Sequence, residues 1–310
     1  MTPKSKLVIG TRGSPLALAQ AHMVQAGVAQ HLGWSKDQVE VAVFKTSGDR
    51  IQDKPLAEFG GKGLFTKELD EALLDGRIDL AVHSMKDVPT RLPEGMILAA
   101  VLPREDVRDR LIAPNAKSVE DLPHGARIGT SSLRRGAQMK LLRPDFVIVP
   151  FRGNVQTRLD KLARGEADAT LLAAAGLRRL GMEHIGTDVS VEAMLPAPAQ
   201  AAIGVTVRTG DEFAASAVSA MNHAETALCV AAERAFLARL DGSCRTPIAA
   251  LATLQADGTV LMKGQVLTPD GTHHVESQSQ SAPEDAVAMA TRLAEALIEQ
   301  GGPAIRRLFG

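Results

Sequence analysis

A cysteine at position 244 lies in the stretch "LDGSCRTPI", on a bend of small residues beside an arginine. Arg245 favours the thiolate form of this side chain, and the small flanking residues leave the sulfur accessible. No Ser/His/Asp or Cys/His arrangement can be assembled from the sequence, so a hydrolytic nucleophile is disfavoured. Two interpretations of Cys244 follow: an inert loop thiol, or a sulfur to which a group is covalently attached.

The other cysteine, Cys229, falls within the apolar pattern of a helix, and we expect it to pack in the core. There is no CxxC pair and no Cys/His spacing typical of a metal site, so we expect neither a disulfide scaffold nor a bound metal. The N-terminal segment has an apolar run of only four residues, too short for a signal peptide. We therefore expect a cytoplasmic protein with free thiols.

Lys86 and Asp87 end a predicted strand in "DLAVHSMKDVP". The structural interpretation is a salt bridge or turn at the strand end. The functional interpretation is a carboxylate held near a cationic cleft, where it stabilises developing positive charge and transfers protons. His83, inside the same strand, is expected to be a core histidine with a hydrogen-bond partner.

Basic residues are concentrated at the junctions between predicted strands and helices. They are Arg12, Lys86, Arg134, Arg135, Arg152, Arg158, Arg178 and Arg179. A single arginine is usually solvated. However, the carboxyl ends of parallel strands form the ligand crevice of an α/β lobe, and arginine binds carboxylates and phosphates in a bidentate manner. The cluster therefore predicts a ligand with several negative groups.

Phosphate and nucleic acid are the weaker candidates for that ligand. The sequence contains no GxxxxGK[ST] motif, and "GGKGLF" at 60–65 indicates a flexible glycine turn. Aromatic residues make up 3% of the chain, which disfavours base stacking. The net charge of −1 disfavours extensive binding to nucleic acid or to a membrane surface.

Short β-rich segments alternate with helical patterns, which is typical of α/β architecture. Helices are predicted over 64–74 and 133–142, and an amphipathic helix within 13–35. Strands are predicted at 6–9, 39–44, 79–84, 96–102, 127–129, 146–149 and 168–172.

Two segments repeat one layout: "LVIGTRGSPLALAQ" (7–20) and "ARIGTSSLRRGAQ" (126–138). Each has an apolar strand, Gly-Thr, a hydroxyl-bearing loop and a helix. Such a junction places hydroxyls and backbone N–H groups at a helix N-terminus, where anions bind well. A purely structural turn and cap is the alternative. Two copies about one domain apart favour two lobes facing each other across a cleft.

Proline-bearing connectors at 102–106 and 195–200 bracket the second copy and predict a hinge. The first domain is then discontinuous, with residues 1–102 and 197–221, and the second covers 106–194. Residues 222–310 form a third domain. In it a helix over 223–240 is followed by two Asp-Gly hairpin signals, at 257–258 and 270–271, and a final helix begins at Pro283.

The segments "TRGSPLA", "GGKGLF", "AVHSMKDVP", "GTSSLRR", "RGNVQTR", "AAGLRRLG", "HAETAL", "AER" and "GSC" occur in this order along the chain. With them the whole chain closely resembles the porphobilinogen deaminase (hydroxymethylbilane synthase) family. The resemblance implies two periplasmic-binding-protein-like α/β lobes with a hinged cleft and a small α+β C-terminal domain.

The resemblance also implies that Cys244 carries a covalent dipyrromethane cofactor, one per chain, through a thioether. The enzyme would make this cofactor from its own substrate, add four porphobilinogen units with loss of ammonia, and release hydroxymethylbilane by hydrolysis. This reaction belongs to tetrapyrrole biosynthesis. We expect a monomer that binds neither nucleic acid nor membrane.

By the same resemblance, Asp87 is the catalytic carboxylate, which hydrogen-bonds pyrrole N–H groups and steadies the cationic azafulvene. The cofactor and substrate side chains would be bound by Arg12, Ser14, Lys86, Thr130, Ser132, Arg134, Arg135, Arg152, Arg158, Arg179 and Gln200.

Two motifs depart from the family pattern: "GGCQ" is "GSCR" here, and "GQGA" is "AQAA" at 199–202. We expect Ser243 to be tolerated beside the thiol. We expect Ala199 and Ala202 to narrow a close approach of the backbone near Gln200.

Two other classes of protein remain as alternatives. A solute-binding receptor or effector-sensing domain shares the two-lobed plan, but it requires neither Cys244 nor Asp87 nor a third domain. A thiol hydrolase would use Cys244, but it lacks a recognisable histidine partner.

Overall fold

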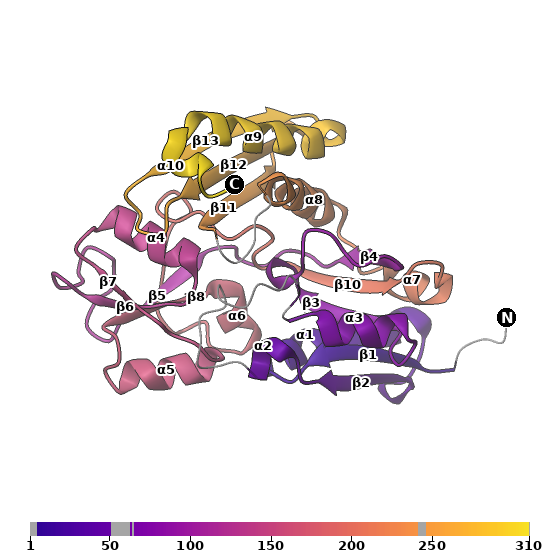
Figure 1. Ribbon diagram of the computed structural model, residues 1–310. Helices are drawn as coiled ribbons and strands as arrows, with labels where there is room; N and C mark the ends of the chain where they lie inside the picture. The colour runs from indigo at the N-terminus through magenta and orange to yellow at the C-terminus, as the bar shows by residue number, and fades with distance from the viewer. Residues whose placement is uncertain (1–4, 51–62, 64, 241–245, 310) are drawn as a thin grey trace. The chain divides into compact units, whose positions relative to one another are not determined.

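The computed structural model describes residues 5–50, 63, 65–240 and 246–309. The chain divides into two compact units, and Figure 1 shows their elements. The first contains the described residues up to 105 together with 201–227, and the second contains 106–200 and the described residues from 228 onward. The second unit therefore joins the predicted domain 106–194 to most of the predicted C-terminal domain.

The first unit is built on a five-stranded sheet with strand order β2-β1-β3-β10-β4. β1 runs parallel to β2 and β3, whereas β10 is antiparallel to β3 and β4. Apolar residues of α1 and α7 pack on one face of the sheet and those of α3 on the other. The bounds are β1 Leu7–Arg12, α1 Pro15–Leu32, β2 Val39–Phe44, α3 Lys67–Leu74, β3 Leu80–Ser84, β4 Met96–Val101, β10 Ile203–Arg208 and α7 Glu212–Ser219.

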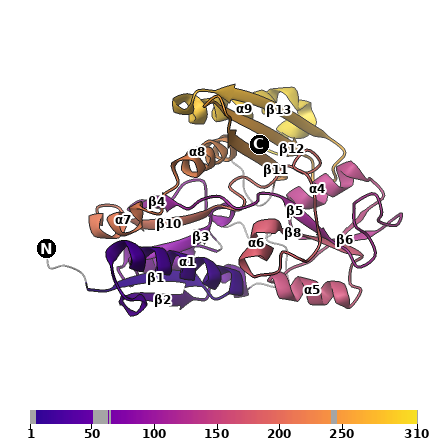
Figure 2. The ribbon, with the colours of Figure 1, turned by 180° about the vertical axis from the view of Figure 1, so that it is seen from behind.

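A second five-stranded sheet, of order β7-β6-β8-β5-β9, repeats this plan in the second unit (Figure 2). β6 is parallel to β7 and β8, and β5 is antiparallel to β8 and β9. α4 packs on one face, and α5 and α6 pack on the other. The bounds are β5 Asp109–Ile112, β6 Arg127–Gly129, α4 Leu133–Leu142, β7 Val147–Val149, α5 Val155–Ala163, β8 Ala169–Ala173, α6 Ala174–Arg179 and β9 Thr187–Asp188.

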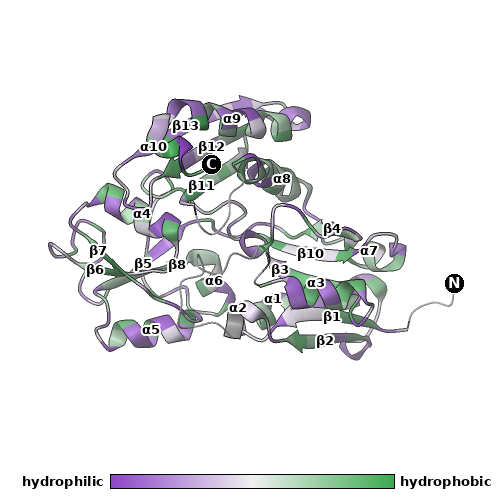
Figure 3. Ribbon diagram, viewed as in Figure 1, coloured by the Kyte–Doolittle hydropathy of each residue, from purple (hydrophilic) through white to green (hydrophobic). Residues whose placement is uncertain are grey.

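The C-terminal part is a three-stranded antiparallel sheet, β11-β12-β13, packed against helices α8 and α9. Gly258 and Gly271 have φ of +82° and +72°, so the two predicted hairpin turns are confirmed. The helices carry hydrophobic and hydrophilic residues together (Figure 3), as amphipathic covering helices do. The bounds are α8 Ala224–Arg239, β11 Ile248–Leu254, β12 Val260–Leu267, β13 His274–Ser281, α9 Ala286–Gln300 and α10 Gly302–Arg306.

The predicted α/β class, with two lobes and a small α+β C-terminal domain, is confirmed by these sheets. Three strands were not predicted: β5, β9 and β10. β10 contains Gly204, where an added Cβ would collide with Met85, and glycine inside a strand weakens the sequence signal. Short helices complete the fold: η1 Lys36–Gln38, α2 Ser47–Arg50, η3 Met85–Asp87 and η4 Pro283–Asp285.

In the described part of the chain, no helix is both long enough and apolar enough to cross a membrane.

Candidate functional site

The β1–α1 junction has the predicted layout. Ser14 is the N-cap of α1, and its hydroxyl accepts a hydrogen bond from the backbone N–H of Ala17 at 3.2 Å. Pro15 occupies the first helical position, where its missing N–H has no cost. Arg12 ends β1, and its guanidinium lies 4.3 Å from the centre of the Phe65 ring. The junction therefore has a hydroxyl at the start of α1 and an arginine at the end of β1.

Lys86 and Asp87 lie on η3, directly after β3. Met85 anchors this turn, because it is buried and its backbone N–H donates to the carbonyl of Ala202 at 3.0 Å. Lys86 is exposed and Asp87 is half-buried. Since β1 and β3 are parallel neighbours, Arg12, Lys86 and Asp87 share the carboxyl edge of one sheet.

His83 is a core residue, as predicted. It is 6% exposed, and its Nε2 lies 3.2 Å from the hydroxyl of Thr206. Burial, and secondarily the positive charge of Arg12, lowers the pKa of His83 to about 4. The imidazole is therefore neutral at neutral pH.

The β6–α4 junction is the second copy of the layout. Ser132 caps α4 by accepting from the N–H of Arg135 at 3.4 Å, and the Thr130 hydroxyl accepts from the N–H of Ser132 at 3.1 Å. Ser131 donates its hydroxyl proton to the carbonyl of Phe151 at 3.0 Å. The two predicted junctions are thus confirmed as strand–loop–helix units with hydroxyls at the helix start.

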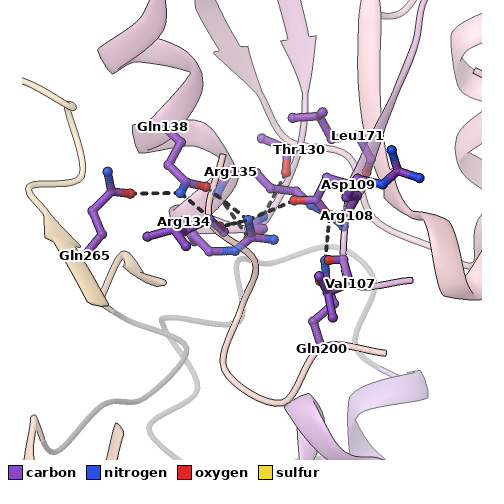
Figure 4. Close-up of polar contacts among 12 residues, drawn as sticks. Val107, Arg108, Asp109, Thr130, Arg134, Arg135, Gln138, Leu171, Gln200 and Gln265 are labelled. Carbon is purple, nitrogen blue, oxygen red and sulfur yellow. Dashed lines mark hydrogen bonds and ion pairs between the residues drawn. The ribbon is translucent and has the colours of Figure 1, made fainter. Parts of the chain in front are cut away.

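Arg134 and Arg135 do not extend from this junction into solvent, since each is 5% exposed (Figure 4). Both contact Asp109, a buried residue of β5 that the sequence reasoning missed. Arg134 Nη1 lies 2.8 Å from Asp109 Oδ2, and Arg135 Nη2 lies 2.7 Å from Oδ1. Burial alone would raise the pKa of Asp109, but the charges and hydrogen bonds of the two arginines outweigh it and hold the pKa well below its usual range.

Gln200 is also directed at this carboxylate. It is 1% exposed, and its Nε2 donates to Asp109 Oδ1 at 2.9 Å and to the carbonyl of Val107 at 2.8 Å. Gln200 therefore hydrogen-bonds the same buried carboxylate that pairs with Arg134 and Arg135.

Three further predicted arginines belong to this lobe. Arg152 follows β7, Arg158 lies in α5 and Arg179 ends α6, and all three are half-buried. Arg158 Nε donates to the carbonyl of Gly153 at 3.0 Å. Because β6, β7 and β8 are parallel neighbours, their carboxyl ends share one edge, where Thr130, Ser132 and Arg152 lie.

The two departures at 199–202 have a backbone consequence. Ala199 and Ala201 have φ of +60° and +73°, in the region that favours glycine. From the sequence we expected Ala199 and Ala202 to be the positions where alanine affects the backbone. This is wrong for Ala202, whose φ is not positive, and the second position is Ala201. The glycines of the family pattern would adopt these angles without strain.

Cys229 is 6% exposed and packs in the C-terminal core, as predicted. Cys244 lies outside the described residues. Among the residues that the structure describes, no group of three or more His, Cys, Asp or Glu side chains could hold a metal ion.

The chemistry of the second lobe suits a carboxylated ligand. Two guanidinium groups and one carboxylate leave a net positive charge in a buried cluster. The Nε atoms of Arg134 and Arg135 are buried and have no hydrogen-bond partner among the described residues. An anion would satisfy both the charge and these donors, so the residues fit a group that carries acetate or propionate side chains.

Comparisons with known proteins cover nearly the whole chain. Residues 7–216 match the family described as "Porphobilinogen deaminase, dipyromethane cofactor binding domain", and 227–299 match "Porphobilinogen deaminase, C-terminal domain". The "Porphobilinogen deaminase" of Paracoccus denitrificans is 52% identical over 296 residues, covering 95% of this chain and 94% of that protein. The "Porphobilinogen deaminase, chloroplastic" of Oryza sativa subsp. japonica is 54% identical over 284 residues, with coverages of 91% and 79%.

Among solved structures, a putative methionine-binding lipoprotein from Bacillus subtilis aligns with a TM-score of 0.43 and 15% identity. The alignment covers 70% of this chain and 89% of that one. This similarity is too low to support an argument about function.

Proposed function

The chain belongs to the porphobilinogen deaminase family, and from this premise we propose which of its residues carry the reaction. The protein is a transferase of tetrapyrrole biosynthesis that condenses porphobilinogen head to tail with release of ammonia, and it uses a dipyrromethane cofactor. The family match excludes the alternatives of a solute-binding receptor and a thiol hydrolase.

Cofactor attachment is assigned to Cys244. The chain has two cysteines, and Cys229 packs among the apolar side chains of the C-terminal core. Arg245 and the small residues around Cys244 favour an accessible thiolate. When bound, the dipyrromethane supplies the fixed pyrrole end from which the product chain grows.

The carboxylates of cofactor and substrate are assigned to the cations and hydroxyls at the carboxyl edges of the two sheets. The observation that carries this proposal is the buried pair Arg134 and Arg135, which has a net positive charge and whose Nε donors have no partner in the described part of the chain. We assign the same role, each within its own lobe, to Arg12, Ser14, Lys86, Thr130, Ser132, Arg152, Arg158, Arg179 and Gln200. Charge-assisted hydrogen bonds from these groups would hold the many acetate and propionate side chains.

Asp87 is assigned as the catalytic carboxylate. It stands on η3, a turn that the burial of Met85 keeps in place. A carboxylate fixed at this edge accepts hydrogen bonds from the pyrrole N–H of the substrate. It also offsets the positive charge that develops on the substrate as ammonia leaves, and it can accept the proton released when the pyrroles join.

We extend the proposal to the domain arrangement, the partners, the cellular location and the oligomeric state. We place a hinge at 102–106 and 195–200, between domain 1 (1–102 and 197–221) and domain 2 (106–194), with 222–310 as a separate cofactor-attachment domain. The net charge of −1 and the lack of a nucleotide motif support a protein without nucleic-acid partners. We assign it to the cytoplasm as a monomer.

Intact-mass measurement tests the assignment of Cys244. Active wild-type protein should be heavier than its sequence by one dipyrromethane and should colour with an acidic aldehyde reagent for pyrroles. Cys244→Ser should lose both signals, whereas Cys229→Ser, the matched control, should keep them. An unmodified mass in active wild-type protein would refute the attachment.

A further inference from the structure

Asp109 is a fully buried carboxylate in β5 for which the proposed function has no role. Its side chain is 0% exposed, and both of its oxygens are engaged. Oδ1 accepts from Arg135 Nη2 at 2.7 Å and from Gln200 Nε2 at 2.9 Å, and Oδ2 lies 2.8 Å from Arg134 Nη1. One carboxylate therefore bridges the two arginines of the proposed anion site.

Each arginine also has contacts besides the one with Asp109. Arg134 Nη1 donates to the carbonyl of Leu195 at 2.9 Å and to Gln138 Oε1 at 3.0 Å. Arg135 Nη1 donates to the carbonyl of Leu171 at 2.9 Å. All of these contacts use the terminal nitrogens, whereas both Nε donors stay buried without a partner among the described residues. The terminal nitrogens of both guanidinium groups are thus held by hydrogen bonds, whereas their Nε–H groups have no acceptor among the described residues.

Gln138 connects this cluster to the C-terminal sheet. Its Nε2 donates to Gln265 Oε1 at 2.9 Å (Figure 4) and to the carbonyl of Leu195 at 3.0 Å. Gln265 Nε2 in turn donates to Glu276 Oε2 at 2.8 Å. The side chain of Gln138 is 1% exposed and belongs to α4. Gln138 therefore ties Arg134 to β12 as well as to its own helix.

The electrostatics explain why Asp109 is needed. Burial, opposed by the charge of Asp109 and assisted by that of Arg135, lowers the pKa of Arg134. Two guanidinium groups in this position repel each other, and buried charges are tolerated only when they are paired. Nearby arginines do not compete for Asp109: Arg108 pairs with Asp106 and Asp188, and Arg110 pairs with Asp188. Asp109 cancels one of the two charges and leaves one for a ligand.

We propose that Asp109, assisted by Gln138, is a positioning residue that holds Arg134 and Arg135 so that their free Nε edges receive a carboxylate of the dipyrromethane cofactor. Asp109 itself does not touch the cofactor; it acts through the two arginines. The inference rests on the proposed assignment of Arg134 and Arg135 to the cofactor carboxylates.

The test measures how fast the cofactor becomes attached to protein that was produced without porphobilinogen. Asp109→Asn keeps the shape of the side chain and removes its charge. After addition of porphobilinogen, the fraction of chain that carries dipyrromethane is measured by intact mass over time. We expect loading to slow by about tenfold or more. Loading should raise the melting temperature of the variant less than that of wild type, because the cofactor interacts more weakly with the folded variant and stabilises it less.

A merely structural role would give a different result. It would lower the melting temperatures of the empty and loaded chains equally, with loading rate and melting-temperature rise as in wild type, and this outcome would overturn the proposal. Asp145→Asn is the matched control. Asp145 pairs at 2.8 Å with Arg143, the C-cap of α4, whereas Arg134 and Arg135 lie in the first turn of that helix. Loss of this pair should therefore reduce stability without slowing loading.

If Asp109→Asn does not fold, Gln138→Leu decides. This substitution removes one acceptor of Arg134, the Gln138 amide oxygen, and leaves the charges unchanged. Slower loading would support the proposal, and loading at the wild-type rate would overturn it. Arg134→Leu and Arg135→Leu separate the two levels of the argument. If they load normally, the assignment of the arginines is wrong. If they load slowly while folded Asp109→Asn loads normally, the positioning role alone is wrong.

Discussion

Glu233 Oε2 accepts a hydrogen bond from the backbone N–H of Ala199 at 2.5 Å. The other oxygen of Glu233 accepts from the N–H of Ala252 in β11 at 2.8 Å, and the residue is fully buried in α8. One side chain of the C-terminal part thus holds both the segment before Gln200 and the first strand of the small sheet.

Glu233→Gln should lower the free energy of unfolding by about 1–3 kcal/mol. The amide of glutamine offers one oxygen and one NH₂ group, so one of the two backbone N–H groups would face a donor and stay unpaired in the core. Urea unfolding measures the change. The control is Glu295→Gln on α9, whose exposed pair with Arg239 should contribute within about 0.5 kcal/mol. Equal effects of the two substitutions would contradict the role of Glu233.

Ala201→Gly should raise the free energy of unfolding by up to about 1 kcal/mol. An alanine in the left-handed region costs about 1–2 kcal/mol, and the greater freedom of glycine in the unfolded chain offsets about 0.5–1 kcal/mol of the gain. Ala202→Gly is the control, because Ala202 is buried and its φ is not positive. Ala202→Gly should lower the free energy of unfolding by about 1 kcal/mol. If Ala201→Gly lowered it as well, Ala201 would not be strained.

His83 should make stability depend on pH. Its folded pKa of about 4 lies below its ordinary value of 6.5, so the unfolded chain binds more protons between these values. The contribution of His83 is therefore complete above about pH 6.5 and is lost as the pH falls toward 4, by about 3 kcal/mol in total. The glutamine of His83→Gln cannot titrate, so the free energy of unfolding of this variant should change less with pH than that of wild type.

The measurement is the difference in free energy of unfolding between wild type and His83→Gln at several pH values from 4 to 7. Taking a difference removes the contributions of carboxylates that titrate in both proteins. His274→Gln, at an exposed position of β13, serves as the control and should follow wild type. A constant difference across this window would show that His83 is not a buried neutral group.

Asp87→Asn should slow each addition of porphobilinogen by about 10²–10⁴-fold while the cofactor stays attached. The amide keeps the shape but removes the charge that offsets the developing cation. Asp87→Glu should retain more activity, because it keeps the charge at a displaced position. Single-turnover ammonia release from loaded protein separates the chemical step from loading. A near-normal rate in the asparagine variant would move the catalytic role to another residue.

The sequence by itself determined the features that depend on local pattern. Apolar runs followed by Gly-Thr and a hydroxyl predicted both helix starts, which Ser14 and Ser132 cap. The Asp-Gly pairs predicted two hairpins, and the apolar settings of His83 and Cys229 predicted their burial. In each case the determining interactions lie within a few residues, so the pattern carries the information.

The partners of the charged residues were decided by the tertiary structure alone. "LPREDVRDR" reads as a charged connector, yet antiparallel pairing of β5 with β8 buries Asp109 at the edge where α4 begins. Arg134 and Arg135, expected to bind the negative groups of a ligand, pair there with that carboxylate. Likewise, only the backbone angles identify Ala199 and Ala201 as the strained pair. The physical reason is that strand order and register, not sequence spacing, bring an acid of one segment against arginines 25 residues or more away.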